Sequence, residues 1–344
     1  MTFGAVRVVQ GLQLDIARGE FVSMLGPSGS GKTTILMMLA GFLTPTAGRI
    51  FVDGQRIDRL PPYRRDMGVV FQNYALFPHM TVAENVAFPL KQRRVGRAET
   101  TERVRRALDM VQLSHTAERR PTMLSGGQQQ RIALARALVF EPSVVLMDEP
   151  LGALDKQLRE QMQLDIRELH RRLGLTIVFV THDQGEALTM SDRIAVFNQG
   201  RIDQIGAPDE IYDRPATRFV AEFIGETNLL PGKVTRVADG LMQVALEGGP
   251  VIAVAADGHA AGDAVLVSLR PERLRIPSGP VAGAENLWPV DVEDCVYQGD
   301  HIRLHLRHGA LRLIARIDRS QPVPEIGHRA QVHFAAADCW IVKP

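Results

Sequence analysis

Short apolar runs alternate with amphipathic helical patterns along the N-terminal part of the chain. Strands are predicted at residues 21–25, 69–71, 144–147, 176–180 and 193–197, and the continuous apolar run at 144–147 is typical of a strand buried on both faces. Helices are predicted between them, at residues 34–40, 124–139 and 158–173, and the last helix ends at Gly174. Strands and helices that alternate through short loops predict an α/β sheet sandwiched by helices.

Other patterns add smaller elements to this framework. Alternation over residues 6–16 predicts a strand or two, and residues 49–52 followed by Asp53 and Gly54 predict a hairpin. The stretch from about residue 73 to residue 124 is helical and polar, with its apolar positions on one helix face. We therefore expect a helical subdomain at about residues 75–140.

The composition shifts near residues 225–232, after which helical stripes vanish. Short strands are predicted at residues 265–269, 302–306 and 311–317, with a hairpin turn at His308 and Gly309. These strands predict a small β-barrel, so we expect two domains, residues 1–226 and 227–344. His301 and His305 share a strand face, and solvated histidines are favoured there over a metal site because no third ligand is in sight.

One motif carries specific chemistry, because it fits the phosphate-binding loop pattern G-x-x-x-x-G-K-[ST]. Its residues are Gly26, Pro27, Ser28, Gly29, Ser30, Gly31, Lys32 and Thr33. The loop lies between a predicted strand and a predicted helix, the context that the motif requires. Glycines let backbone N–H groups point at phosphate oxygens, Lys32 can reach the β- and γ-phosphates, and the Thr33 hydroxyl is placed to ligate Mg²⁺.

Polar residues follow other predicted strands of the same sheet. Asp148 ends a buried strand, where it would hold Mg²⁺, and Glu149 beside it could activate a water molecule. Gln72 and His182 also follow strands, at the sheet edge where ligands bind in open α/β folds. Gln72 could contact Mg²⁺ and water, and His182 the γ-phosphate. Taken singly they would be ordinary loop side chains, so their significance comes from the set.

A second anion site is predicted at Ser125, Gly126 and Gly127, which combine a hydroxyl, two glycines and a helix N-terminus. The chain has a single phosphate-binding loop and a single such segment. If both contact one ATP, the simplest arrangement is a two-fold dimer in which each segment faces the partner's loop.

The bulk composition limits the remaining possibilities. The net charge is +1 over 344 residues, which gives no support for nucleic-acid binding by bulk charge. Two cysteines without a C-x-x-C pair argue against a disulfide framework or zinc site and fit a reducing compartment. No apolar run approaches the ~18 residues of a membrane span, and no signal peptide is evident. We expect a soluble, cytosolic protein whose partner would carry any membrane span.

The whole set resembles the nucleotide-binding subunit of ABC transporters, over essentially the whole chain. The resemblance makes residues 26–33 the Walker A motif, Gln72 the Q-loop residue, residues 124–128 the signature and residues 144–148 the Walker B motif. Glu149 is then the catalytic carboxylate and His182 the switch histidine. The resemblance makes residues 151–155 the D-loop. It implies further nucleotide contacts at Phe3, Thr34, Gln128 and the D-loop residue Asp155, and Mg²⁺ ligands at Thr33, Gln72 and Asp148.

Phe3 stands where the family places the aromatic that stacks on adenine. Family members usually carry a further N-terminal strand before this aromatic, whereas this chain begins two residues ahead of it. A start upstream of Met1, or a truncation, would explain the difference.

The C-terminal part resembles the junction and OB-like (TOBE) domain of bacterial importers for polyamines, ferric iron, sulfate or sugars. Residues 224–229, 269–272 and 181–188 carry this likeness, which is strongest to spermidine/putrescine import subunits. It implies an ATP hydrolase on the cytoplasmic face of the inner membrane, acting as a homodimer with two integral membrane permease subunits and, indirectly, a periplasmic solute-binding protein. No nucleic acid is expected.

Two other classes are possible from the sequence. One is a soluble or regulatory ABC ATPase, although this chain lacks the second cassette or long coiled coil that translation and repair members carry. The other is a module whose β domain binds a small molecule or oligonucleotide. Its few, scattered aromatic residues lack an interleaved basic stripe, which argues against oligonucleotide binding.

Overall fold

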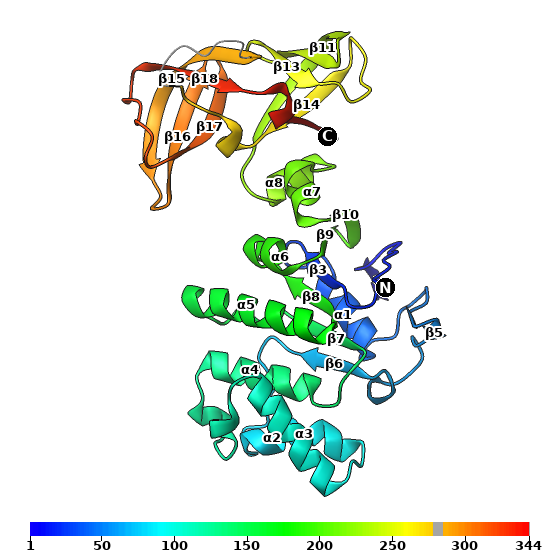
Figure 1. Cartoon of the computed structure of the whole chain (residues 1–344). Coiled ribbons are helices and arrows are strands. Elements are labelled where there is room, and N and C mark those ends of the chain that lie inside the picture. Colours follow the sequence, from blue (N-terminus) through cyan, green and yellow to red (C-terminus); the bar gives the residue numbers. More distant parts are fainter. Residues whose placement is uncertain (278–284, 344) are drawn as a thin grey trace. The chain divides into compact units, whose positions relative to one another are not determined.

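The computed structural model describes residues 1–277 and 285–343, which form two compact units, Met1–Pro208 and Asp209–Pro344 (Figure 1). The first unit is built on a six-stranded sheet with the order β10-β9-β3-β8-β7-β6. Its strands are β3 Phe21–Leu25, β6 Met67–Val70, β7 Val144–Asp148, β8 Thr176–Thr181, β9 Arg193–Asn198 and β10 Arg201–Gly206. All pairings are parallel except that of β10 with β9.

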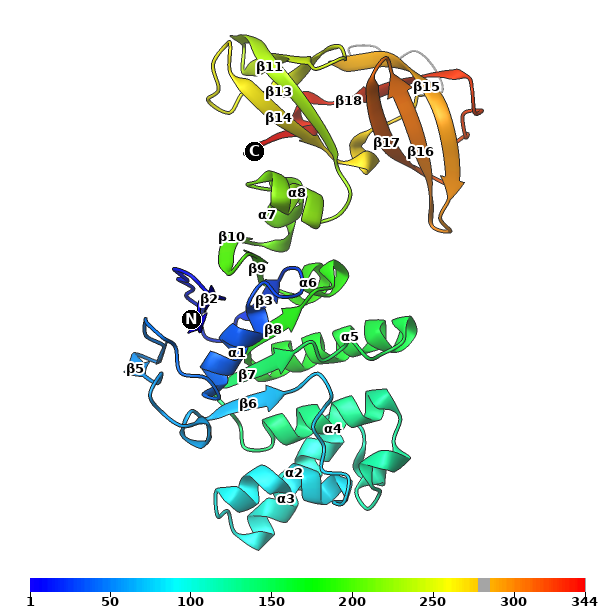
Figure 2. The same cartoon turned by 180° about the vertical axis from the view of Figure 1, so that it is seen from behind.

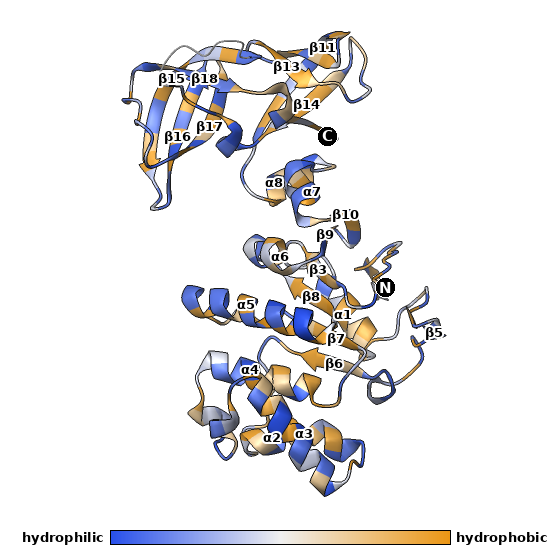
Figure 3. Cartoon of the chain, viewed as in Figure 1, coloured by the Kyte–Doolittle hydropathy of each residue, from blue (hydrophilic) through white to orange (hydrophobic). Residues whose placement is uncertain are grey.

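Helices cover both faces of this sheet. On one face α1 (Lys32–Ala40) packs Ile35 and Leu36 against alternate strand residues such as Val178. On the other face α5 (Lys156–Leu173) packs Met162 and Ile166, and α6 (Gln184–Met190) adds a contact at its end. Figure 3 shows β6 and β8 in hydrophobic colours and much of α5 in hydrophilic colours, as expected for a buried strand and an amphipathic helix.

A helical subdomain interrupts the sheet between β6 and β7, as predicted. It consists of α2 (Val82–Gln92), α3 (Arg97–Met110) and α4 (Gly126–Leu138), packed around their own core. Two short hairpins complete the unit: β1 (Thr2–Phe3) with β2 (Val6–Arg7), and β4 (Phe51–Val52) with β5 (Gln55–Arg56). Short 3-10 turns occur at η1 Pro62–Arg64, η2 Ser114–Thr116 and η3 Pro121–Met123.

The second unit begins within α7 (Pro208–Asp213), at Asp209, includes α8 (Arg218–Phe223) and continues as two antiparallel sheets around one apolar core. One has the order β13-β12-β11-β14-β19 and the other β17-β16-β15-β18; Figure 2 shows both. The strands are β11 Asn228–Ala238, β12 Leu241–Leu246, β13 Val251–Ala255, β14 Ala264–Leu269, β15 Asn286–Tyr297, β16 His301–His308, β17 Leu311–Asp318, β18 Arg329–Phe334 and β19 Cys339–Val342, with 3-10 turns at η4 Pro271–Arg273 and η5 Ala336–Asp338.

Two buried asparagines join the two sheets. The side-chain amide of Asn228 exchanges hydrogen bonds of 2.9 and 2.7 Å with the backbone of Ile314, and Asn286 does the same with Ala253 at 2.9 and 2.7 Å. Each side-chain amide thus pairs with the backbone of a strand in the other sheet, as a neighbouring strand would. These two links join the sheets at the edges of their shared barrel-like core.

Several expectations need correction. The strand predicted over residues 6–16 ends at Arg7, because no described strand pairs with residues 8–16. The last strand of the first unit is β10, since β9 is followed by this more polar edge strand. Gln72 follows β6 by two residues, because β6 ends at Val70. The domain boundary at 226/227 remains a prediction; α7 and α8 precede it, and β11 begins just after it.

Candidate active site

The phosphate-binding loop connects β3 to α1, as predicted. Gly26 packs so closely on β9 that a Cβ atom there would lie 2.4 Å from the Phe197 carbonyl oxygen. Gly29 and Gly31 have left-handed φ angles of 80° and 98°, which side chains other than glycine adopt with strain. Between Gly26 and Gly29, Pro27 is half-buried and Ser28 is exposed. The loop therefore turns sharply into the N-terminus of α1, where the first N–H groups of the helix have no intrahelical partner.

Lys32 lies within this loop, with only 4% of its surface exposed. Its ammonium donates to the carbonyl oxygens of Gly26 at 2.7 Å and Pro27 at 2.9 Å, and lies 3.4 Å from the hydroxyl of Ser30. Burial lowers the pKa of Lys32, and the carboxylates of Glu149 and Asp148 oppose that shift. A positive charge is thus held under the loop by bonds to its own backbone.

Thr33 and Asp148 form a pair beside Lys32. The Thr33 hydroxyl donates to Oδ1 of Asp148 at 3.0 Å. Burial raises the pKa of Asp148, while the Thr33 hydrogen bond acts against the rise. A hydroxyl and a carboxylate held this close present the oxygen ligands that Mg²⁺ favours.

The Glu149 carboxylate lies next to two other predicted site residues, Gln72 and His182. Its Oε2 accepts from Nε2 of Gln72 at 3.4 Å and lies 3.1 Å from Nδ1 of His182, within ion-pair distance. The carboxylate side chain is 20% exposed, and the His182 side chain is 56% exposed. Glu149 adopts a φ of 43°, a strained conformation held by its N–H, which donates to the carbonyl of Val180 at 3.0 Å.

The structure therefore brings together the chemistry-bearing residues that follow β3, β6, β7 and β8: Lys32, Thr33, Gln72, Asp148, Glu149 and His182. Carboxyl ends of parallel strands meet at one sheet edge, so residues distant in sequence converge there. Thr34 lies half-buried in the first turn of α1.

Other predicted site residues lie at helix starts. Ser125 caps α4 in a reciprocal arrangement with Gln128, with bonds of 3.4 and 3.0 Å. Ser125 and Gly126 are exposed, whereas Gly127 is buried and a Cβ atom there would lie 2.7 Å from Leu158. The carboxylate of Asp155 caps α5 by accepting from Leu158 N–H at 3.0 Å. We call the six residues Lys32, Thr33, Gln72, Asp148, Glu149 and His182 the P-loop cluster. In the described part of the chain, no hydrogen bond joins the caps of α4 and α5 to this cluster.

Phe3 lies in the first hairpin and is 46% exposed. The structure shows no bond between this ring and the phosphate-binding loop within the described residues, so its predicted adenine contact stays a prediction. Gly31, however, lies near this N-terminal segment, because a Cβ atom there would approach the Val8 carbonyl oxygen at 2.8 Å.

Sequence comparisons identify relatives that have the same combination of domains. Residues 9–152 match the ABC transporter family model, and residues 267–342 match the TOBE domain model. The chain is 47% identical to the spermidine/putrescine import ATP-binding protein PotA of Rubrobacter xylanophilus, over 99% of this chain and 91% of that protein. It is 53% identical to the protein of the same name from Thermobifida fusca, over 78% of this chain and 70% of the relative. The chain belongs to this family of ABC transporter proteins.

Solved structures support the assignment of the first unit. The dimeric structure of a bacterial ABC transporter cassette is 35% identical and covers 60% of this chain and 94% of its own, with a TM-score of 0.54. A dimeric post-hydrolysis structure of the same cassette, bound to ADP and Pi, is 33% identical, with the same coverage and TM-score. The predicted fold class, an ABC cassette followed by an OB-like TOBE domain, is confirmed.

Two arginines that the sequence analysis did not single out hold the backbone of loops next to the site. Arg136 of α4 donates to the carbonyl oxygens of Tyr74 at 2.8 Å and Ala75 at 2.7 Å, both in left-handed conformations. Arg159 of α5 donates to the carbonyl of Leu154, beside the D-loop aspartate. A basic residue within an apolar helical stretch, as at Arg136, is the sequence signal that could have pointed to such an interaction.

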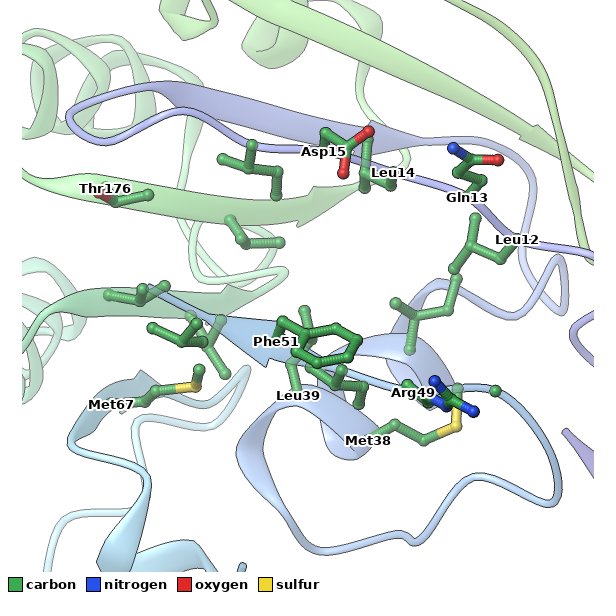
Figure 4. Close-up of a pocket in the computed structure, with 18 of the residues that line it drawn as sticks. Leu12, Gln13, Leu14, Asp15, Met38, Leu39, Arg49, Phe51, Met67 and Thr176 are labelled. Carbon is green, nitrogen blue, oxygen red and sulfur yellow. The ribbon is translucent and has the colours of Figure 1, made fainter. Parts of the chain in front are cut away.

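A cavity of about 690 Å³ lies elsewhere in the first unit. Figure 4 shows the segment carrying Leu12 and Asp15 on one side of it, and Phe51, Met38 and Leu39 on the other. None of the predicted site residues lines this cavity. No helix of the described residues has both the length and the apolar character needed to cross a membrane.

Proposed function

We propose that this protein is the ATP-hydrolysing subunit of an importer for polyamines such as spermidine and putrescine. Relatives named as spermidine/putrescine import proteins, between 47% and 53% identical over most of the chain, support the transported solute. The observation that carries the hydrolytic function is the Glu149 carboxylate, which accepts a hydrogen bond from Gln72 and lies 3.1 Å from Nδ1 of His182, beside the phosphate-binding loop.

ATP binding follows from the P-loop geometry. The glycines and the N-terminus of α1 present N–H groups to the phosphates, and Lys32 supplies a positive charge from under the loop. On binding, Lys32 would exchange bonds to the loop carbonyls for bonds to phosphate oxygens. Positioning and charge stabilisation are the main catalytic contributions in this class of reaction.

Thr33, Asp148 and Gln72 are the residues that we propose hold Mg²⁺. The hydroxyl and the carboxylate lie 3.0 Å apart, and Gln72 donates through its amide nitrogen, which leaves the amide oxygen for the metal. When bound, Mg²⁺ supplies charge neutralisation of the β- and γ-phosphates.

Glu149 is the proposed general base. Its carboxylate accepts a proton from the attacking water as that water approaches the γ-phosphorus. Gln72, which donates to Glu149, and His182, whose Nδ1 lies 3.1 Å from it, keep this carboxylate oriented. His182 is also exposed enough to contact the γ-phosphate.

A homodimer completes the proposed site. The N-terminus of α4, with exposed Ser125 and Gly126, is an anion site that does not serve the phosphate-binding loop of its own chain. In a two-fold dimer it would close over ATP on the partner's loop, with Asp155 near the same interface. The dimeric structures of the related cassette support this arrangement.

Coupling to import requires membrane proteins. We propose that two of these cassettes act on the cytoplasmic face of the inner membrane with two integral permease subunits, and indirectly with a periplasmic solute-binding protein. The relatives named as import ATP-binding proteins support this assembly. The proposed domains are residues 1–226 for the cassette and 227–344 for the TOBE domain.

Uptake by cells that lack the gene for this chain tests the proposal. Expression of the wild type is expected to restore uptake of radiolabelled spermidine, whereas Glu149→Gln is not. Glu168→Gln, at an exposed position on α5, is the matched control and should behave as wild type. Restoration of ferric iron, sulfate or sugar uptake with no change in spermidine uptake would contradict the polyamine assignment.

A further inference from the structure

Arg159 connects two loops of the proposed active site. It lies one turn into α5, just after Asp155. One guanidinium nitrogen donates to the Leu154 carbonyl at 3.1 Å, and the other donates to Oδ2 of Asp183 at 3.2 Å. Its Nε lies 3.8 Å from the carboxylate of Glu186, an ion-pair distance. One side chain therefore joins the D-loop to the segment that carries His182.

The segment around His182 is held on both sides by this cluster. Before it, the Thr181 hydroxyl donates to Glu186 at 2.6 Å and accepts from the N–H of Asp183 at 3.0 Å. After it, Oδ1 of Asp183 accepts from the Glu186 N–H at 3.1 Å and so caps α6. His182 lies between two fixed residues, and its ring reaches Glu149.

Arg159 balances the negative charge of two carboxylates next to His182. Asp183 and Glu186 are two carboxylates within one turn, and Glu186 is only 3% exposed. Arg159 forms an ion pair with each of them, at 3.2 Å from Asp183 and 3.8 Å from Glu186. Without it the carboxylates would repel each other, and Asp183 would lose one of the bonds that set its position.

We infer that Arg159 is a positioning residue that transmits the position of the D-loop to His182. This inference rests on the proposed function, in which Asp155 lies near the dimer interface. When the partner closes on the D-loop, the shift at Leu154 reaches Asp183 through the guanidinium, and His182 is set against Glu149 and the γ-phosphate. Hydrolysis in each site then depends on closure of the dimer, while ATP binding at the P-loop does not involve Arg159.

The test compares kcat and KM for Mg-ATP with the affinity for a fluorescent ATP analogue. Arg159→Met removes the donors, and Arg159→Lys retains a single charged donor group. Asp183→Asn removes the ion pair but keeps a side chain that caps helices well. Arg171→Met, at an exposed position on the same helix, is the matched control.

Arg159→Met is expected to lower kcat by about tenfold or more, because small displacements of catalytic groups have effects of that size or larger. Nucleotide affinity should stay within about threefold, since Arg159 does not touch the P-loop cluster; this split between kcat and affinity distinguishes positioning from binding. Arg159→Lys should recover part of the loss. The double variant with Asp183→Asn should be no slower than Arg159→Met, because both changes break the same link.

Equal kcat values for Arg159→Met and Arg171→Met would overturn the inference. So would a normal kcat in Arg159→Met accompanied by a lower thermal unfolding midpoint, which would assign Arg159 a structural role only. If Arg159→Met does not fold, Arg159→Lys and Asp183→Asn take its place: kcat values below that of Arg171→Met would support the inference, and kcat values equal to it would overturn it. A wild type that binds ATP but does not hydrolyse it would instead overturn the proposed function.

Discussion

Ser125 allows helix capping to be separated from phosphate binding. Its hydroxyl caps α4, and it is exposed at the N-terminus that we propose meets the partner's ATP. Asp and Asn cap helices about as well as Ser, so Ser125→Asp and Ser125→Asn should each change the free energy of unfolding by less than about 0.5 kcal/mol. The two variants have nearly the same shape and differ in charge.

The charge should be unfavourable only in the dimer, because an acidic residue at a helix N-terminus is favourable within one chain. A carboxylate about 4 Å from a phosphate charge, at an effective dielectric constant of about 20, is repelled by about 4 kcal/mol. Because ~1.4 kcal/mol corresponds to tenfold in an equilibrium constant, each such contact should weaken ATP-driven dimerisation of Ser125→Asp roughly a thousandfold, and a two-fold dimer contains this contact twice. Ser125→Asn should dimerise within about tenfold of the Ser125 protein, because its cap is neutral.

Light scattering in Mg-ATP measures this difference, in a Glu149→Gln background that slows hydrolysis. Thermal unfolding of each variant verifies that α4 is still capped. Raising the salt concentration should partly restore dimerisation of Ser125→Asp, since screening weakens the repulsion. Equal dimerisation by the Asp and Asn variants would refute the placement of α4 against the partner's phosphate.

Two substitutions and one labelling experiment test other parts of the account. Gly26→Ala should lower the free energy of unfolding by about 1–3 kcal/mol and weaken ATP binding, because its Cβ would lie 2.4 Å from the Phe197 carbonyl oxygen; calorimetry and nucleotide titration measure both, and unchanged values would contradict this packing. Arg136→Met should lower the free energy of unfolding by about 1.5–3 kcal/mol and reduce kcat, because it releases the backbone that follows Gln72; denaturant titration and steady-state kinetics test this, and a wild-type kcat would argue against it. Burial raises the pKa of Cys339 to about 12. The neutral thiol therefore stabilises the folded protein fully below the ordinary thiol pKa of about 8.5, and this stabilisation is lost as the pH rises towards 12. Alkylation at about pH 8.5, followed by mass spectrometry, should label Cys339 only in urea, and equal labelling without urea would contradict its burial.

Much of the first unit could be predicted because its signals are local. The continuous apolar run at 144–147, and the run at 21–25 that only Ser23 interrupts, are typical of central strands, and β7 and β3 lie there. The P-loop has a backbone conformation that its glycines specify. Helix starts at Ser125 and Asp155 follow from capping chemistry, which involves residues three positions apart.

The missed features depend on partners that are distant in sequence. Alternation over residues 8–16 favours a strand, but a strand forms only where another backbone pairs with it. The edge strand β10 is polar and has little burial to mark it. Arg159 resembles any basic residue of an amphipathic helix until folding brings Asp183, from beyond β8, within 3.2 Å.

Hydrolysis of ATP by the purified chain, measured beside Glu149→Gln and the exposed control Glu168→Gln, is the most direct test of the central claim. The wild type and the control should hydrolyse ATP at the same rate. Glu149→Gln should bind ATP but hydrolyse it at least about a hundredfold more slowly, because it lacks the general base. Hydrolysis by Glu149→Gln at the wild-type rate would contradict the catalytic assignment on which the mechanism rests.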